Sequence, residues 1–344
     1  MASRFLGKWH PLPHPREGLS NYLSALEELV QRQSFSVVLA LNDYTALALS
    51  QARLQTRLVV PPASSVDLAH DKFRTLELAR SLGLAIPRSR LVRSQEELRQ
   101  AVEELGTPLV IKLNRGNGAI GMRHLRTPAT GLPELSSATS DEVYDFGHFL
   151  VQTELQGKVH DVCVLFEHGQ LRAALTQKRL RTYPPEGGVG ILVETTWRPD
   201  LVELAELLLK ALNWHGPAQV EFLLEGPQQT PTLLEINGRF WGKLDLAIQA
   251  GVNFPQLACC PQRSAPSSYR VGLRYRWSWP LGLLYVLQIG RGGWDFFFPN
   301  RATVSDFWWS DPLPLVAEAW CSLQSLSRRG FRPISRLARV RGKA

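Results

Sequence analysis

Two neighbouring apolar segments, Ala218–Leu224 and Thr232–Asn237, each carry a single glutamate within a run that otherwise favours a β-strand. Gly226 and Pro227 lie between the segments and favour a turn, so the two are predicted to pair as antiparallel strands. A glutamate on an apolar strand is costly to bury unless a cation or a hydrogen-bond donor satisfies it. The pair of strands therefore predicts a sheet that carries a charged site.

Period-two alternation assigns the side chains of the second strand to opposite faces of the sheet. One face is expected to hold Leu233, Glu235 and Asn237, and the other Leu234 and Ile236. Glu221 comes from the first strand, so two carboxylates and one amide oxygen are expected to converge. These are oxygen ligands, which suit Mg²⁺ held jointly by protein and phosphate oxygens. The alternative is that Glu221 and Glu235 pair with arginines on a solvated face of the sheet.

A glycine-rich loop follows the predicted strand Pro108–Lys112. Gly116, Gly118 and Gly121 fall within six residues, so the backbone amides of this loop can approach a phosphate closely. The loop is not of the Walker A type, because no Gly-Lys-Ser/Thr closes it, and it lacks the spacing of the dinucleotide-binding fingerprint. A surface hairpin rich in glycine is the alternative interpretation.

Apolar periodicity and turn residues predict the remaining elements. The expected helices are Leu19–Arg32, Tyr44–Ala52, Ala69–Leu82, Glu96–Leu105 and Leu201–Leu212. The expected strands are Ser36–Leu41, Arg57–Val60 and Phe149–Leu155, with a hairpin formed by Asp161–Glu167 and Gln170–Arg179. Helices and strands mix along the chain, which predicts an α/β protein with α+β subdomains.

The run Leu234–Gly242 (LEINGRFWG) and the following Ala247–Pro255 (AIQAGVNFP) resemble the ATP-grasp superfamily. The resemblance is closest to its carboxylate–amine ligase and carbamoyl-phosphate-synthase-like branch. It extends over about residues 36–258, where the other parts follow in the family's order. These parts are Asp71-Lys72 at the start of a helix, Val110-Ile-Lys112, the glycine-rich loop, a strand ending at Gly157, Gln177–Arg181, Gly187-Gly188, Val220-Glu221-Phe222 and Glu235-x-Asn237.

The resemblance implies a role for each matching residue. For the nucleotide it implies Lys72 and Lys112 at the phosphates, Gly116, Gly118 and Gly121 in a loop that closes over the β- and γ-phosphates, and Gln152, Glu154 and Leu155 in a hinge that holds adenine. For the chemistry it implies Lys178, Arg181 and Arg239 as cations that stabilise the transferring phosphoryl group, and Glu221, Glu235 and Asn237 as metal ligands.

Three features depart from the family pattern. Gly238 stands where the family often has proline, and Lys243 stands where it often has a small residue. The usual acidic contact to ribose is out of register, with Lys158 and Val159 in its place, which leaves Asp161 as its substitute. The N-terminal subdomain is also shorter than the family usually has.

The resemblance implies an ATP-grasp fold with a shortened, Rossmann-like pre-ATP-grasp subdomain and a C-terminal extension. We expect the first subdomain at residues 1–66, the ATP-grasp domain at 67–258 and the extension at 259–344. Within the ATP-grasp domain, a small lid subdomain is expected at about 85–155 and a larger metal-binding subdomain at about 156–258.

The activity implied by the resemblance is that of an ADP-forming ligase. Such an enzyme uses ATP and Mg²⁺, with Mn²⁺ as an alternative metal, to phosphorylate a carboxylate and transfer it to an amine. Two alternatives stay open: carbamoyl-phosphate-synthase-like activation of bicarbonate or a carbonyl oxygen, and a non-catalytic ATP-binding scaffold. The expected partners are small-molecule carboxylate and amine substrates, neither of which the sequence names.

The formal charge of +8 is concentrated in the C-terminal quarter of the chain. Residues 263–344 hold 13 Lys/Arg and four Asp/Glu, a net of +9, together with six of the ten tryptophans. Such a segment favours weak contact with a membrane surface, and no nucleic-acid-binding module accompanies it, so no specific nucleic acid is expected. The alternative is a solvated basic surface with tryptophans packed beneath it.

The four cysteines form neither a CxxC pair nor a metal-binding pattern, and no apolar stretch reaches the ~20 residues that a membrane-spanning helix needs. No signal peptide is recognisable at the start of the sequence. We therefore expect a reduced, cytoplasmic protein, either monomeric or homodimeric.

Overall fold

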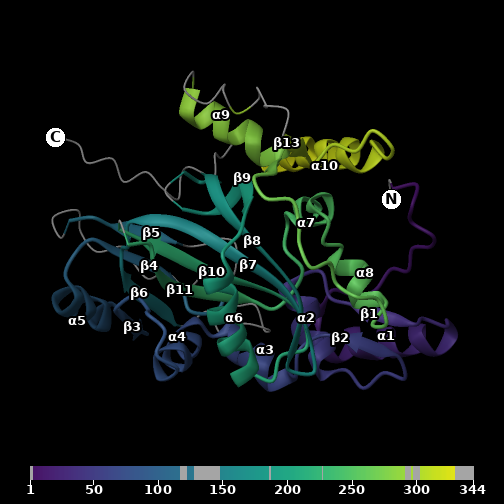
Figure 1. Cartoon of the computed structure of the whole chain (residues 1–344), viewed down its shortest axis with the longest axis horizontal. Helices are drawn as coiled ribbons and strands as arrows, with labels where there is room; N and C mark the ends of the chain where they lie inside the picture. Colours follow the sequence, from purple (N-terminus) through teal and green to yellow (C-terminus); the bar gives the residue numbers. More distant parts are fainter. Residues whose placement is uncertain are drawn as a thin grey trace. The chain divides into compact units, whose positions relative to one another are not determined.

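The computed structural model describes residues 3–116, 122–127, 148–185, 187–226, 228–290, 296 and 303–329, with side chains up to residue 321 (Figure 1). The chain divides into two compact units. The larger unit comprises Leu12–Lys178 and Thr195–Val271. The smaller unit comprises Met1–Pro11, Arg179–Glu194 and Gly272–Ala344.

The larger unit begins with a small α/β subdomain. Its elements are η1 (Pro15–Glu17), α1 (Leu19–Arg32), β1 (Val37–Leu39), α2 (Asp43–Gln51) and β2 (Arg57–Val59). The two strands pair in parallel, and buried residues of α1, α2 and the strands form one apolar cluster. The predicted helices and strands of this region are confirmed.

The helix expected over Ala69–Leu82 is instead two helices, α3 (Ala63–His70) and α4 (Lys72–Ser81). Asp71 separates them: its backbone is extended, and its carboxylate accepts a hydrogen bond from the Arg74 N–H of the next helix. An aspartate in this conformation caps a new helix rather than continuing the old one. The prediction of a single helix is therefore wrong, because apolar periodicity runs through the break.

A four-stranded antiparallel sheet follows, in the order β3-β6-β4-β5. Its strands are β3 (Ser89–Val92), β4 (Leu109–Leu113), β5 (Arg123–Leu125) and β6 (Phe149–Thr153), and α5 (Gln95–Leu105) packs against it. Buried residues of the helix and the strands form a separate apolar cluster. This sheet therefore has its own small core.

The main sheet of the larger unit has the order β11-β10-β7-β8. Its strands are β7 (Gly157–Glu167), β8 (Gln170–Tyr183), β10 (Gly216–Glu225) and β11 (Thr230–Asn237). The antiparallel pairs β7–β8 and β10–β11 confirm the predicted hairpin and the predicted strand pair. Strand β8 passes into the smaller unit after Lys178.

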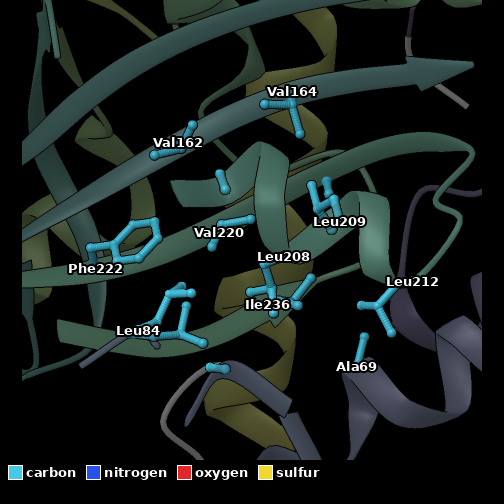
Figure 2. Close-up of a cluster of buried hydrophobic side chains, with 14 of the residues drawn as sticks. Ala69, Leu84, Val162, Val164, Leu208, Leu209, Leu212, Val220, Phe222 and Ile236 are labelled. Carbon is cyan, nitrogen blue, oxygen red and sulfur yellow. The ribbon is translucent and has the colours of Figure 1, made fainter. Parts of the chain in front are cut away.

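Helix α6 (Pro199–Ala211) packs on one face of this sheet (Figure 2). Figure 2 shows Leu208 and Leu209 of the helix directed at Val220 and Ile236 of the strands. These four side chains belong to the largest apolar cluster among the described residues, which also includes buried residues of α3 and α4. The opposite face of the same strands is left for polar side chains. Helices α7 (Leu244–Ala250) and α8 (Phe254–Cys259) complete the larger unit.

The pairing of β10 with β11 contains a β-bulge. Glu221 lies opposite Glu235, and the next pair along the ladder uses Leu233, so the ladder skips Leu234. One extra residue in a strand reverses the alternation of faces beyond it. Leu233 and Ile236 consequently lie in the same apolar core. The prediction that Leu233 shares a face with Glu235 is therefore wrong, although Glu235 and Asn237 do share one.

The smaller unit contains most of β9 (Val189–Thr196), which pairs with β12 (Arg274–Arg276), and β12 pairs with β13 (Thr303–Ser305). Its helical elements are η3 (Ser278–Gly282), α9 (Leu283–Ile289) and α10 (Leu313–Arg329). A small cluster that includes Ile191, Tyr285, Val286 and Phe296 forms its apolar centre. None of the helices in the described ranges is long and apolar enough to cross a membrane.

Candidate active site

Two carboxylates face each other on the polar side of the main sheet. Glu221 of β10 and Glu235 of β11 lie directly opposite across the antiparallel ladder. The side-chain nitrogen of Asn237 donates to both, over 3.2 Å to Glu221 and 3.3 Å to Glu235. Like charges directly opposite each other destabilise a sheet, and burial increases the cost. The two carboxylates are therefore expected to need cations close by to stabilise them.

Two lysines from neighbouring elements supply positive charge. The ammonium group of Lys72, the first residue of α4, lies 3.7 Å from a carboxylate oxygen of Glu235. Burial lowers the pKa of Lys112 on β4 to about 8, while Glu235 opposes this shift, Lys72 adds to it and Glu221 opposes it. Both predicted phosphate-binding lysines thus lie within electrostatic reach of the carboxylate pair.

Arg239 joins the cluster from the segment after β11. Its Nε donates to a carboxylate oxygen of Asp43 over 3.1 Å, and its Nη2 donates to the Asn237 side-chain oxygen over 3.4 Å. Asp43 lies in the first turn of α2 and is buried. His70 approaches the other oxygen of Asp43 at 4.0 Å, but burial lowers the pKa of His70. The imidazole is therefore uncharged at neutral pH, and Arg239 is the cation that balances Asp43.

The end of β4 is fixed to the start of α4. The Asn114 side chain accepts from the Phe73 N–H over 2.9 Å and donates to Asp71 over 3.0 Å. The Lys72 N–H donates to the Asn114 carbonyl over 3.2 Å, and the Lys72 ammonium group donates to the Gly116 carbonyl. The first glycine of the glycine-rich loop is therefore held beside the N-terminus of a helix.

A row of polar side chains extends from the carboxylates across the sheet. Asp161 of β7 lies opposite Glu221 on one side and opposite Gln177 of β8 on the other. Asp161 is fully buried and accepts from Gln177 Nε2 over 2.8 Å. Lys178 follows Gln177 along β8. The structure thus places Asp161 beside Glu221, within a strand, and its role at ribose stays a prediction.

The predicted adenine hinge lies on and after β6. Gln152 is buried and donates to the Ser89 hydroxyl over 2.8 Å. The Glu154 carboxylate lies 3.0 Å from His124 Nδ1, and Leu155 is half-buried. The side chains of Gln152 and Glu154 therefore already have protein partners.

Three predicted site residues lie outside the described part of the larger unit. Arg181 lies on the part of β8 that belongs to the smaller unit. Gly118 and Gly121 lie outside the described residues.

The polar groups of the cluster fit a divalent cation such as Mg²⁺. Glu221 and Glu235 are hard oxygen donors, and a half-turn of the Asn237 amide exchanges its nitrogen for its oxygen. Among the described residues, no group of three His, Cys, Asp or Glu side chains is arranged to hold a metal ion. A cation here would therefore take its further ligands from the amide and from phosphate oxygens.

Asp43 and Asn114 are members of the cluster that sequence reasoning did not single out. Asp43 follows β1 closely and Asn114 follows β4 directly. Both are buried, and each contacts a residue that the sequence did single out. A polar residue just past a short apolar strand is the signal that would have found them. Asp43 also follows a strand of a parallel pair, and the carboxyl ends of parallel strands commonly bind ligands.

Comparison with known proteins identifies the fold. Residues 145–277 match the family model described as ATP-grasp in the biosynthetic pathway with Ter operon. A D-alanine–D-alanine ligase of Verminephrobacter eiseniae is 28% identical over 186 residues, which cover 49% of this chain and 54% of that relative. The chain therefore spans about half the length of the curated relatives it matches.

Two solved structures resemble the chain at low sequence identity. The biotin carboxylase domain of a Hydrogenobacter thermophilus 2-oxoglutarate carboxylase, in complex with MgADP, ADP and bicarbonate, has a TM-score of 0.61 at 16% identity and covers 74% of this chain and 61% of that one. An L-amino acid ligase from Bacillus licheniformis has a TM-score of 0.56 at 18% identity, covering 72% and 61%. The predicted α/β fold class is confirmed.

Proposed function

The chain belongs to the ATP-grasp superfamily, and on this premise we propose that it is an ADP-forming ligase that joins a carboxylate to an amine. The single observation that carries the proposal is the convergence of Glu221, Glu235 and Asn237 with the cations Lys72 and Arg239. Paired carboxylates surrounded by fixed cations suit a metal–nucleotide phosphate group better than they suit a purely structural role.

In the proposed reaction, a carboxylate oxygen of the substrate attacks the γ-phosphorus of ATP. The bond from this phosphorus to the ADP oxygen breaks, which leaves an acyl-phosphate and ADP. An amine nitrogen then attacks the acyl carbon, inorganic phosphate leaves, and the nitrogen loses a proton. Exclusion of water from the site favours attack by the amine over hydrolysis.

Each polar group has a proposed part in this reaction. Lys72 and Lys112 hold the β- and γ-phosphates, while Arg239 and Lys178 stabilise the charge that spreads over the transferring phosphoryl oxygens. Glu221, Glu235 and Asn237 would hold Mg²⁺, which neutralises phosphate charge when bound. The support for Mg²⁺ comes from the donor set of this chain and from the MgADP complex of a structural neighbour.

The remaining nucleotide contacts are proposed from the same resemblance. Gln152, Glu154 and Leu155 line the adenine hinge, Asp161 contacts ribose, and Gly116 with Gly118 and Gly121 covers the phosphates. The separate core of the four-stranded sheet supports a lid subdomain at about 85–155, distinct from a metal-binding subdomain at about 156–258. The proposed outer boundaries are 1–66 for the first subdomain and 259–344 for the extension.

The test is trapping of the acyl-phosphate. The purified full chain is incubated with ATP, Mg²⁺, hydroxylamine and a panel of amino acids and other carboxylic acids, beginning with D-alanine because matched relatives are D-alanine–D-alanine ligases. We expect one class of acid to give a hydroxamate together with ADP. Arg239→Ala should lower the rate of trapping by about 10²-fold or more, since removal of one charge-stabilising donor commonly has that effect.

Arg99→Ala is the matched control, because Arg99 pairs with Glu96 on an exposed helical face of α5. This variant should keep the full rate of trapping. If no acid yields hydroxamate or ADP, and Arg239→Ala binds ATP like the parent chain, the ligase proposal is wrong and an ATP-binding scaffold takes its place. Release of ADP with bicarbonate alone would instead support carbamoyl-phosphate-synthase-like chemistry. The similarity of the chain to amino acid ligases does not favour this alternative.

A further inference from the structure

A hollow of about 390 Å³ lies in the small α/β subdomain of the larger unit, and no step of the proposed reaction uses it. Its walls come from the C-terminal half of α1, from the loop before β1 and from the loop before β2. Pockets that bind small molecules have volumes of about 300–1,000 Å³. The hollow therefore has room for a small ligand.

The hollow and the candidate active site lie at opposite ends of the same strands. The two loops that line the hollow precede β1 and β2, so they lie at the amino ends of this parallel pair. Asp43, which binds Arg239, comes after the carboxyl end of β1. A ligand in the hollow would therefore leave the carboxylate pair of the candidate active site free.

Contacts within the subdomain fix the shape of the hollow. Val30 and Leu54 line it and also pack against the apolar cluster of the subdomain. The Thr56 hydroxyl donates to the Phe35 carbonyl over 2.7 Å, which ties the loop before β2 to the loop before β1. The hollow is therefore formed in advance of any ligand, and part of its lining is apolar.

Two opposite charges line the hollow without pairing. Neither the Glu27 carboxylate of α1 nor the Arg53 guanidinium group has a hydrogen bond or an ion pair with the residues that the structure describes. The next acid of the same helix, Glu28, pairs instead with Arg32 and does not line the hollow. Exposed charges of opposite sign thus pair where the fold lets them meet, and here the fold leaves one of each sign unpaired in a single hollow.

Amide side chains and the end of α1 complete the lining. The side-chain amides of Gln31, Gln33 and Gln55 line the hollow and have no partner within the described part of the chain. An amide both donates and accepts, so these groups suit the polar atoms of a small ligand. The last carbonyls of α1 lie at the same end, where the negative end of the helix dipole favours a cation.

We propose that this hollow binds a small zwitterion, either an α-amino acid or a short peptide with free ends. The ammonium group of the ligand pairs with Glu27, its carboxylate pairs with Arg53, and its carbon atoms lie on Val30 and Leu54. A guanidinium group binds a carboxylate through two parallel hydrogen bonds, which fixes the orientation of the ligand. A ligand with one charge would leave either Glu27 or Arg53 unpaired, so the lining favours a zwitterion over a simple acid or amine. This property goes beyond the proposed ligase activity and does not depend on it.

The experiment is an NMR titration of the ¹⁵N-labelled full chain with glycine, L-glutamine and L-alanyl-L-glutamine. We expect at least one of them to bind with a Kd on the order of 0.1–1 mM, as ligand efficiency allows for about ten non-hydrogen atoms. Acetylation of the amino group or amidation of the carboxylate should each raise this Kd about tenfold, because each removes one charge-assisted contact.

Each variant should affect only the ligand group that it contacts. Glu27→Gln should raise the Kd of the free ligand about tenfold and leave that of the N-acetylated ligand unchanged. Arg53→Gln should do the same for the free and the amidated ligand. Both residues are exposed, so both variants should fold. Glu28→Gln is the matched control, since Glu28 lies next to Glu27 but pairs with Arg32, and it should bind the ligand like the parent chain.

Three outcomes would overturn the proposal. The first is no binding of any of the three compounds at ten times the expected Kd. The second is an acetylated or amidated ligand that binds as tightly as the free one, which would mean that the hollow does not read both charges. The third is binding that is lost in Glu235→Gln but kept in Glu27→Gln and Arg53→Gln, which would place the zwitterion at the candidate active site instead.

Discussion

Charged side chains are usually exposed and apolar side chains are usually buried. The two units of this chain depart from this rule in opposite directions. In the larger unit, Asp43, Glu221 and Asp161 are charged groups under 10% exposed, and each is held by polar partners from other elements. In the smaller unit, Trp309 and Trp320 are apolar groups more than 60% exposed. Buried charge costs free energy unless it is compensated, and exposed apolar surface costs free energy until it is covered. The first departure is compensated within the chain, whereas the second leaves apolar surface in contact with solvent.

The largest expected effect is stabilisation of the chain by ATP with Mg²⁺. Its absence would show that the buried charges do not form a nucleotide site. With ATP at about 100 times its Kd and Mg²⁺ present, binding should raise the free energy of unfolding by about 2.7 kcal/mol. Glu235→Gln should remove most of this gain, because one of the two carboxylates loses its charge. The measurement is thermal unfolding with ATP, with and without Mg²⁺.

Glu203→Gln, an exposed glutamate on α6, is the matched control and should keep the full metal-dependent gain. Equal stabilisation by ATP with and without Mg²⁺ would show that Glu221, Glu235 and Asn237 do not hold a metal ion.

The next largest effect is expected when the ion pair between Asp43 and Arg239 is broken. Asp43→Asn keeps the shape but removes the charge opposite Arg239, so the guanidinium group should lose its fixed position. Since supporting contacts to reacting groups typically contribute 10- to 100-fold, we expect kcat to fall about tenfold while KM for ATP stays nearly constant. Steady-state kinetics would measure both constants. A purely structural role would instead lower the melting temperature and leave kcat per folded molecule unchanged.

Lys112 predicts two opposite responses to pH, both tied to its pKa of about 8. Above this pH the folded protein loses the positive charge that we propose faces the phosphates, so affinity for ATP should fall by up to about tenfold per pH unit. In the absence of ATP, the unfolded chain keeps the Lys112 proton up to its ordinary pKa while the folded chain does not. Because the unfolded state binds more protons in this window, the Lys112 contribution to stability rises with pH.

Titration of ATP binding and chemical unfolding between pH 7 and 10 would test both responses. Lys112→Met should flatten both profiles. An ATP affinity that is independent of pH across this range would show that Lys112 does not face the phosphates.

The smallest expected effect concerns the exposed apolar side chains of the smaller unit. Trp320→Ser should change the free energy of unfolding by less than about 0.5 kcal/mol, because the side chain is mostly solvated in the folded protein. Leu208→Ala, in the core beneath α6, should by contrast cost about 2–5 kcal/mol. Urea unfolding would compare the two. A large loss of stability in Trp320→Ser would mean that this face is already covered within the folded chain.

Local pattern predicted the elements of this protein well. The bounds of α1 agree with its apolar periodicity, and β7 and β8 form the hairpin that was predicted from Asp161–Glu167 and Gln170–Arg179. The convergence of Glu221 with Glu235 also followed from two adjacent strands and a tight connection. These features depend on residues near each other in sequence, where hydrogen-bond geometry and side-chain spacing leave few alternatives.

Local pattern failed where one residue changes the geometry around it. The break at Asp71 and the bulge at Leu234 both interrupt a regular repeat without altering its apolar composition. Periodicity averages over several residues, so it does not register a single capping or skipped position.

The sequence by itself determined the residue types of the proposed nucleotide site, their order along the chain and the strands that carry them. Only the tertiary structure decided that Asp43 meets Arg239, 196 residues later, and that Ser3 meets Asp311, 308 residues later. Such contacts depend on the packing of whole elements against each other, and no short-range preference encodes which distant side chains will be neighbours.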